Sequence, residues 1–212
     1  MRGVVISLFD KTGNMVRPWA DAGHACICYD IQHEGARREG NIVFSHWDAL
    51  HETLVAPIHG EIAAVFAFPP CTHLAVSGAR WFKGKGLRKL AESIHMFAAA
   101  AEFCEASGAP YMIENPVSTI SSYWRKPDHT FHPHEYTWFN HGDNYTKKTC
   151  LWVGNGFVMP APCKAEGLGE PDNRIHAAPP SDDRSDIRSA TPMGFSRAVQ
   201  LANVRQLNQE TA

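Results

Sequence analysis

Two short motifs contain residue types that can do chemistry together. A Pro-Pro-Cys motif ends at Cys71, directly after an apolar run, and a Glu-Asn-Pro motif begins at Glu114. Because proline restricts the backbone, two prolines can aim a cysteine thiol into a cleft. A carboxyl group held beside a thiol indicates an acid–base partnership. Taken singly, a half-buried structural cysteine and an exposed loop carboxylate would explain these residues, so the inference depends on the two motifs together.

A basic segment follows Cys71 and indicates a nucleic-acid partner. Residues 80–89 contain five cations and no acidic residue, with Trp81 and Phe82 among them. The cations are Arg80, Lys83, Lys85, Arg88 and Lys89. Basic side chains neutralise phosphates, and aromatic rings stack on bases. Glycines at 78, 84 and 86 would make the segment mobile, as a loop that closes over a substrate must be. The alternative is a solvated helix start with two core aromatic residues.

The elements that must position these residues form an alternating pattern. Short apolar runs alternate with helical stretches, which is typical of an α/β sheet. Predicted strands cover residues 4–9, 25–29, 42–44, 62–68, 111–113 and 150–153. Predicted helices cover residues 15–22, 87–107 and 195–207. The segments 117–148 and 155–187 show little periodicity or several prolines, so both are predicted as loops.

Three polar segments lie where predicted strands end. Residues 10–14 follow the first strand, Cys71 follows the fourth, and Glu114 follows the fifth. Ligands of open α/β sheets bind outside the carboxyl ends of the strands, so the sequence predicts one active site at this edge. A length of 212 residues favours a single domain over 1–212.

These motifs and their order resemble those of the DNA cytosine-5 methyltransferase family. Pro-Pro-Cys after a fourth strand and Glu-Asn after a fifth are the specific part of the likeness. Gly78 and Gly194 match glycines of the family's cysteine loop and last motif. The likeness is to small phage-type members without a target-recognition domain. It implies a Rossmann-like, S-adenosylmethionine-dependent methyltransferase fold, with a mostly parallel sheet and helices on both faces.

The resemblance implies S-adenosylmethionine as the cofactor. By position, its site would comprise Phe9, Asp10, Lys11, Gly13, Asp30, Asp48 and Pro69. Asp30 stands where the family has an acidic residue for the ribose hydroxyls, and Asp48 where one contacts the adenine. Asp10 and Lys11 replace the family's usual Ala-Gly, so we expect Lys11 to pair with a carboxylate of the cofactor. Because Lys11 could pair with an additional carboxylate, carboxy-S-adenosylmethionine is an alternative cofactor, and the product would then carry a carboxymethyl group.

The family chemistry assigns roles to three residues. A thiolate that adds to C6 of cytosine makes C5 nucleophilic, and a carboxylic acid near N3 stabilises the developing charge. The resemblance gives these roles to Cys71 and Glu114. Lys147 replaces a family arginine and would keep a cation beside the base without the bidentate fork.

The target cytosine must leave the base stack to be reached, so the resemblance implies flipped or single-stranded DNA. The residues predicted to contact this DNA are Arg80, Trp81, Lys83, Lys85 and Arg88. Only residues 155–187 stand where family members carry a recognition domain, too few for a second core. The protein would therefore read little sequence, act on single strands, dimerise as a homodimer, or act with a partner. The same chemistry on a free cytosine nucleotide or RNA, and a nucleic-acid-binding relative without turnover, are the alternatives.

The bulk composition is that of an ordinary globular protein. The net charge is −2, so any basic surface must be local, and no apolar run reaches the length of a membrane span. The six cysteines lack paired CxxC motifs, and without a signal peptide we expect reduced thiols in a bacterial or phage-infected host cytoplasm. Histidines 129, 132, 134 and 141 cluster without a zinc-site spacing, so no metal is predicted. His73, close to Cys71, could tune the thiol or contact a phosphate.

Overall fold

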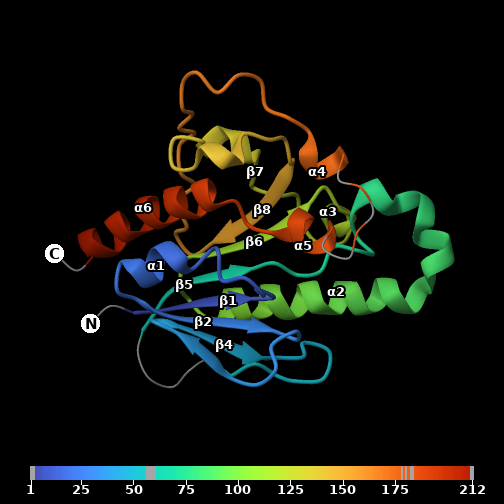
Figure 1. Ribbon diagram of the computed structural model, residues 1–212. Helices are drawn as coiled ribbons and strands as arrows, with labels where there is room; N and C mark the ends of the chain where they lie inside the picture. Colours follow the sequence, from blue (N-terminus) through green and yellow to red (C-terminus); the bar gives the residue numbers. More distant parts are fainter. Residues whose placement is uncertain (1–2, 56–60, 178, 180, 182–183, 211–212) are drawn as a thin grey trace. The chain divides into compact units, whose positions relative to one another are not determined.

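The protein is built on a mostly parallel sheet, seen in a computed structural model that describes residues 3–55, 61–177, 179, 181 and 184–210 (Figure 1). The strands are β1 (Val4–Leu8), β2 (Ala25–Asp30), β3 (Arg37–Glu39), β4 (Ile42–His46), β5 (Ile62–Ala67), β6 (Tyr111–Pro116), β7 (His129–Phe131) and β8 (Thr149–Gly154). Their order is β3-β4-β2-β1-β5-β6-β8-β7, and β4, β2, β1, β5 and β6 are mutually parallel. The chain order reverses at β1, which is the mark of a Rossmann-like sheet. The predicted α/β fold is confirmed.

The helices connect and cover these strands. They are α1 (Arg17–Asp21), α2 (Phe82–Ala106), α3 (Ile120–Tyr123), α4 (Arg174–Ala177), α5 (Arg184–Ser189) and α6 (Met193–Glu210). Short 3₁₀ helices are η1 (Val76–Trp81), η2 (Pro133–Tyr136) and η3 (His141–Asp143). Within the described ranges, no helix is both long and apolar enough to cross a membrane.

The chain forms two compact units. The first consists of Met1–Thr130 and Thr149–Phe157, and the second of Phe131–Lys148 and Val158–Ala212. The first unit carries most of the sheet, so both motifs that could do chemistry belong to it.

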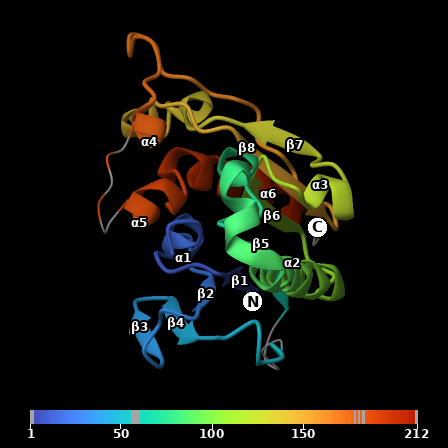
Figure 2. The same ribbon diagram turned by 90° about the vertical axis from the view of Figure 1, so that its right-hand side faces the viewer.

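The sheet of the first unit is covered on both faces. Alternate residues of a strand face opposite sides, so neighbouring positions on β5 contact different helices. Trp19 of α1 packs on Phe66, with ring centroids 5.8 Å apart. Phe97 of α2 packs on the opposite face against Trp152 of β8, at 5.4 Å. Figure 2 shows α1 and α2 on the two sides of β1 and β5. The predicted covering of both faces is therefore confirmed.

An aromatic cluster forms the centre of the second unit. The ring of Phe131 stacks on Phe195 with centroids 3.8 Å apart, and Tyr136 lies edge-on to Phe195 at 5.1 Å. Asp143 accepts a hydrogen bond from the backbone N–H of Gly194 at 2.7 Å. A Cβ at Gly194 would lie 2.5 Å from the carbonyl oxygen of Tyr136, so only glycine fits there. This cluster holds the segment 131–148 against the start of α6.

All six predicted strands are confirmed, and the differences elsewhere have local causes. The prediction that 117–148 is a loop is wrong in part, because α3, β7 and two 3₁₀ helices lie there. Elements of three or four residues are too short to show a periodic pattern. The predicted loop 155–187 contains α4 and the start of α5. The helix predicted from Leu87 is extended to Phe82, with a break at Gly86, whose φ of 80° is outside the helical range.

Candidate active site

Three parallel neighbours, β1, β5 and β6, bring their carboxyl ends to one edge of the sheet. Ser7, Phe66 and Met112 stand in register across them. The chain leaving β5 stays close to β1, because the N–H of Phe68 donates to the carbonyl of Leu8 at 3.0 Å. The loops that follow these strands therefore begin side by side, as the sequence predicts.

The loop that contains Cys71 begins with a tight turn. The backbone N–H groups of Leu74 and Ala75 both donate to the carbonyl of Cys71, at 2.9 and 2.8 Å. The Cys71 side chain is half-buried, so a ligand can reach it. None of the six cysteines, all of which the structure describes, forms a disulfide. Cys71 is thus a partly exposed thiol at a hydrogen-bonded turn.

The segment after Glu114 is joined to this loop by backbone hydrogen bonds. The N–H of Val76 donates to the carbonyl of Val117, and the N–H of Thr119 donates to the carbonyl of Leu74, each at 3.0 Å. A short antiparallel bridge pairs Ala75 with Ser118. The two sequence motifs therefore lie in adjoining loops on the same edge of the sheet.

Asn115 makes the link between the motifs themselves. Its side chain is 1% exposed, and its Nδ2 donates to the carbonyl oxygen of Pro69 at 2.8 Å. This bond ties the Glu-Asn strand end to the first proline of the Pro-Pro-Cys motif. Sequence reasoning gave Asn115 no role of its own. Its place between Glu114 and Pro116 was visible in the sequence, but its burial and its hydrogen-bond partner were not.

Glu114 lies on the face of the sheet covered by α1. Its neighbour Ile113 packs in the core beneath α2. Because adjacent residues of a strand point to opposite faces, the side chain of Glu114 lies on the other face, together with that of Met112. Ser7 shares that face through its register with Phe66. The hydroxyl of Ser7 donates to the carboxylate of Asp10 at 2.7 Å. Glu114 and the loop after β1 are therefore on one side of the sheet.

The loop after β1 is shaped by Asp10. Its buried carboxylate also accepts from the backbone N–H groups of Thr12 and Gly13, at 3.0 and 2.7 Å. Phe9 has a φ of 56°, which is rare for a residue with a side chain. Gly13 has a φ of 69°, and a Cβ there would lie 3.0 Å from the ring of Phe44. Asp10 thus builds the loop that the sequence assigns to the cofactor, and Lys11 is exposed on it.

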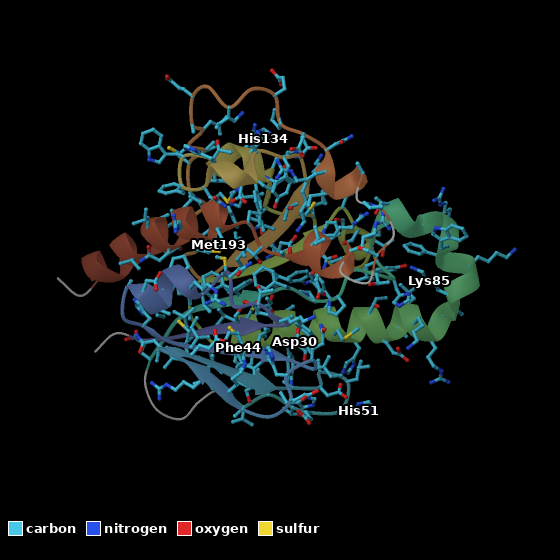
Figure 3. The ribbon with its side chains drawn as sticks, in the orientation of Figure 1. Asp30, Phe44, His51, Lys85, His134 and Met193 are labelled. Atoms are coloured by element: carbon cyan, nitrogen blue, oxygen red, sulfur yellow. The ribbon has the colours of Figure 1, made fainter. Side chains whose placement is uncertain are left out.

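Two further acidic residues lie at the ends of β2 and β4. Asp30 is buried, accepts from the N–H of Gln32 at 2.8 Å, and has its pKa raised by burial. Asp48 accepts from Nδ1 of His51 at 2.7 Å, which lowers the pKa of Asp48 and raises that of His51. The rings of Phe9 and Trp47 lie 5.0 Å apart and bridge the loops after β1 and β4. Asp30, Phe44 and His51 are marked in Figure 3.

The predicted nucleic-acid contacts are spread along η1 and the start of α2. Trp81 is 60% exposed, with the guanidinium of Arg80 5.0 Å from its ring centroid. Lys83 and Arg88 are exposed as well. Lys85 instead reaches back to the cysteine loop, where its Nζ donates to the carbonyl oxygen of Thr72 at 2.6 Å.

The remaining predicted site residues are placed separately. Pro69 is buried in the first unit, beside Asn115. Lys147 is half-buried and belongs to the second unit, whereas Cys71 and Glu114 belong to the first. Across the described part of the chain, no three His, Cys, Asp or Glu side chains are grouped to hold a metal ion.

Comparisons with known proteins give a distant structural likeness. No protein-family model and no curated protein matches the chain. Among the solved structures that match is the glycopeptide N-methyltransferase MtfA, at 11% sequence identity and a TM-score of 0.33. The match covers 73% of this chain and 65%, or just under two thirds, of that one.

Proposed function

We propose that this protein is an S-adenosylmethionine-dependent methyltransferase that modifies C5 of cytosine in DNA. The observation that carries the proposal is the hydrogen bond from Asn115 to the carbonyl of Pro69. It joins the loop of the nucleophile candidate Cys71 to the strand end of the acid candidate Glu114. We infer the reaction from the resemblance of the motifs, and we infer the position of the site from the edge of the sheet that both loops share.

Each side chain then has a defined task. The Cys71 thiolate forms a bond from Sγ to C6 of cytosine, which breaks the C5–C6 double bond and makes C5 nucleophilic. Glu114 in its acid form donates to N3 and stabilises the charge that develops on the ring. After C5 has gained the methyl group and lost its proton to a base, the Sγ–C6 bond breaks and Cys71 is restored. S-adenosylmethionine would supply the electrophilic methyl group, and its S–CH3 bond would break to leave S-adenosylhomocysteine.

The residues at the ends of β1, β2 and β4 fit such a cofactor. Gly13 packs closely on the ring of Phe44, from which a Cβ would lie 3.0 Å, so the loop lies close to the sheet. Asp30 and Asp48 present carboxylate acceptors, as ribose hydroxyls and an adenine amino group require. Lys11 is exposed on the same loop and could pair with the cofactor's carboxylate, including that of carboxy-S-adenosylmethionine.

The exposed basic segment favours DNA over a free nucleotide. Arg80, Lys83 and Arg88 can neutralise several phosphates, and the exposed Trp81 can stack on a base. A flipped or single-stranded cytosine satisfies the need for access. Lys147 remains a proposed cation beside the base, and a homodimer or a partner protein remains the proposed source of sequence selectivity.

A trapping experiment tests the proposal. Single-stranded DNA with one 5-fluorocytosine is incubated with the protein and S-adenosylmethionine, and mass spectrometry measures the intact adduct. We expect a covalent complex with the wild type and none with Cys71→Ser, while Cys163→Ser, a half-buried cysteine of the second unit, still forms it. An adduct on RNA or on a nucleotide, but not on DNA, would show that DNA is not the substrate. An adduct that still forms with Cys71→Ser would refute the mechanism. The mass of nucleosides from unmodified DNA separates methyl from carboxymethyl transfer.

A further inference from the structure

A cavity of about 360 Å³ lies next to the Cys71 loop. Its walls are formed by His73, Phe82, Lys83, Lys85, Gly86, Leu87 and Leu90. This volume is within the usual range of small-ligand sites, roughly 300 to 1,000 Å³. The cavity is tied to the nucleophile loop, because the Lys85 ammonium that lines it donates to the carbonyl of Thr72, the residue after Cys71.

The break in α2 creates the cavity. At Gly86 the backbone has φ 80° and ψ 162°, so residues 82–85 leave the axis of the long helix that starts at Leu87 (Figure 1). A Cβ at Gly86 would meet nothing within 4 Å, so the glycine serves the bend and not a close contact. The bend places the half-buried side chains of Phe82 and Leu90 on the walls of the cavity. Leu87, which also lines the cavity, is 84% exposed.

The lining combines an apolar wall with positive charge. Phe82, Lys83 and Lys85 line the space, and the Lys85 ammonium lies 6.0 Å from the centroid of the Phe82 ring. Among the residues that the structure describes, no acidic side chain lines it. Figure 3 shows Lys85 on the bent segment that precedes the long part of α2. An aromatic face stacks on a base, and ammonium groups bind phosphate. A ligand that is both flat and anionic satisfies both features.

His73 adds a polar group that lacks a partner. Its Nδ1 is buried and makes no hydrogen bond with any residue that the structure describes. Burial and the nearby ammonium groups of Lys85 and Lys89 lower the pKa of this imidazole. The neutral ring has one donor and one acceptor nitrogen, as hydrogen bonding to the edge of a base requires. A buried polar atom without a protein partner needs a partner from elsewhere, and a ligand in the cavity that His73 lines could supply it.

We propose that this cavity binds the base and phosphate of a nucleotide adjacent to the target cytosine in a single DNA strand. The inference rests on the proposed function, because the target cytosine is defined by its reaction with Cys71. Phe82 stacks on the neighbouring base, His73 bonds to its edge, and Lys83 binds its phosphate. The cations beyond the cavity, Arg80 and Arg88, favour a strand with several phosphates over a single nucleotide.

Binding without turnover tests this assignment. The dissociation constant is measured by fluorescence anisotropy for a labelled single strand of thymidines with one central cytosine, without methyl donor. We expect Phe82→Ala to weaken binding roughly ten- to a hundredfold, as loss of one stacked base does. Lys83→Ala should reduce the slope of log affinity against log salt by about one phosphate contact. Lys126→Ala, which removes an exposed lysine outside the basic segment, is the matched control and should change affinity less than about twofold.

Strands with an abasic site on either side of the cytosine identify the base that is bound. We expect Phe82→Ala to have no further effect on one of these two strands, because the stacked base is already missing. An equal loss on the intact strand and on both abasic strands overturns the proposal. So does thymidine monophosphate that competes as strongly as the strand, or RNA of the same sequence that binds more tightly with the same dependence on Phe82.

Two controls keep the outcomes separate. Circular dichroism melts show whether Phe82→Ala is folded, and Lys83→Ala, an exposed position, tests the phosphate contact independently. A wild-type protein that forms the 5-fluorocytosine adduct but shows no coupling between Phe82 and a neighbouring base refutes this inference alone. Coupling without any adduct refutes the proposed chemistry and still supports a strand-binding cavity.

Discussion

Replacing Asn115 with alanine should separate the position of the Cys71 loop from the chemistry of its thiol. The substitution removes the hydrogen bond that Nδ2 donates to the buried Pro69 at 2.8 Å. It leaves Cys71 and Glu114 unchanged in type. The loop then keeps its backbone contacts to the segment after β6 but loses its link to the strand itself.

The expected loss of stability follows from the hydrogen bond that the substitution removes. A neutral buried hydrogen bond contributes about 1 kcal/mol net, and an unpaired carbonyl raises the loss to ~1–3 kcal/mol. Oδ1 of Asn115 is buried without a partner among the described residues, so its removal offsets part of the loss. We therefore expect the free energy of unfolding to fall by about 1–2 kcal/mol. A displacement of about 1 Å at a reacting atom can slow chemistry by roughly a hundredfold, so the adduct should form ~10- to 100-fold more slowly.

Asn203 of the second unit provides a matched control. Its buried amide accepts from the N–H of Val158 at 2.9 Å and donates to the carbonyl oxygens of Val158 and Val199. We expect Asn203→Ala to lower stability at least as much as Asn115→Ala, because it loses more bonds. Urea denaturation gives the stability of both variants, and stopped reactions with 5-fluorocytosine DNA give the adduct rate. If Asn115→Ala loses stability yet forms the adduct at the wild-type rate, the argument that this bond positions Cys71 is refuted.

Three other expectations concern single groups. Burial raises the pKa of Cys26 to about 12, so iodoacetamide at pH 8 should modify Cys71 at least about a hundredfold faster, as peptide mass spectrometry would show; equal rates would contradict the burial. Gly13→Ala should lower the free energy of unfolding by ~2–3 kcal/mol in urea, because the residue is left-handed and a Cβ there meets an aromatic ring. Asp48 raises the pKa of His51, and His51 lowers that of Asp48. The pair therefore stabilises the fold while Asp48 is ionised and His51 is protonated, and it loses that contribution as pH rises through the raised pKa of His51 or falls through the lowered pKa of Asp48. In Asp48→Asn, an NMR titration should find the His51 pKa lowered, and an unchanged pKa would disprove the pairing.

The centre of the sheet could be predicted from sequence because β1 and β5 are apolar runs that are buried on both faces. Strand β5 is one such run, and the residues that follow it mark its end by two prolines. β7 could not be predicted, because its three residues have no period and depend on pairing within the sheet. Local propensity is informative only over longer windows.

The position of the candidate residues at one edge of the sheet could be predicted, and their contacts could not. The order of Cys71 and Glu114 along the strands is enough to place both at one edge. Nothing in the sequence shows that Asn115 bonds to Pro69, since that contact joins residues from different strands. The role of Asp10 inside its own loop was likewise hidden, because an aspartate after a strand can bind a ligand or cap a turn.

The path of the chain limits how this protein can be taken apart or recombined. It passes from one compact unit to the other after residues 130, 148 and 157. A chain cut after residue 157 would retain Phe131 and Tyr136 but lose Phe195, the ring that both contact. The second unit therefore cannot be removed as one continuous segment. An exchange of this unit between related chains would need three junctions, chosen together.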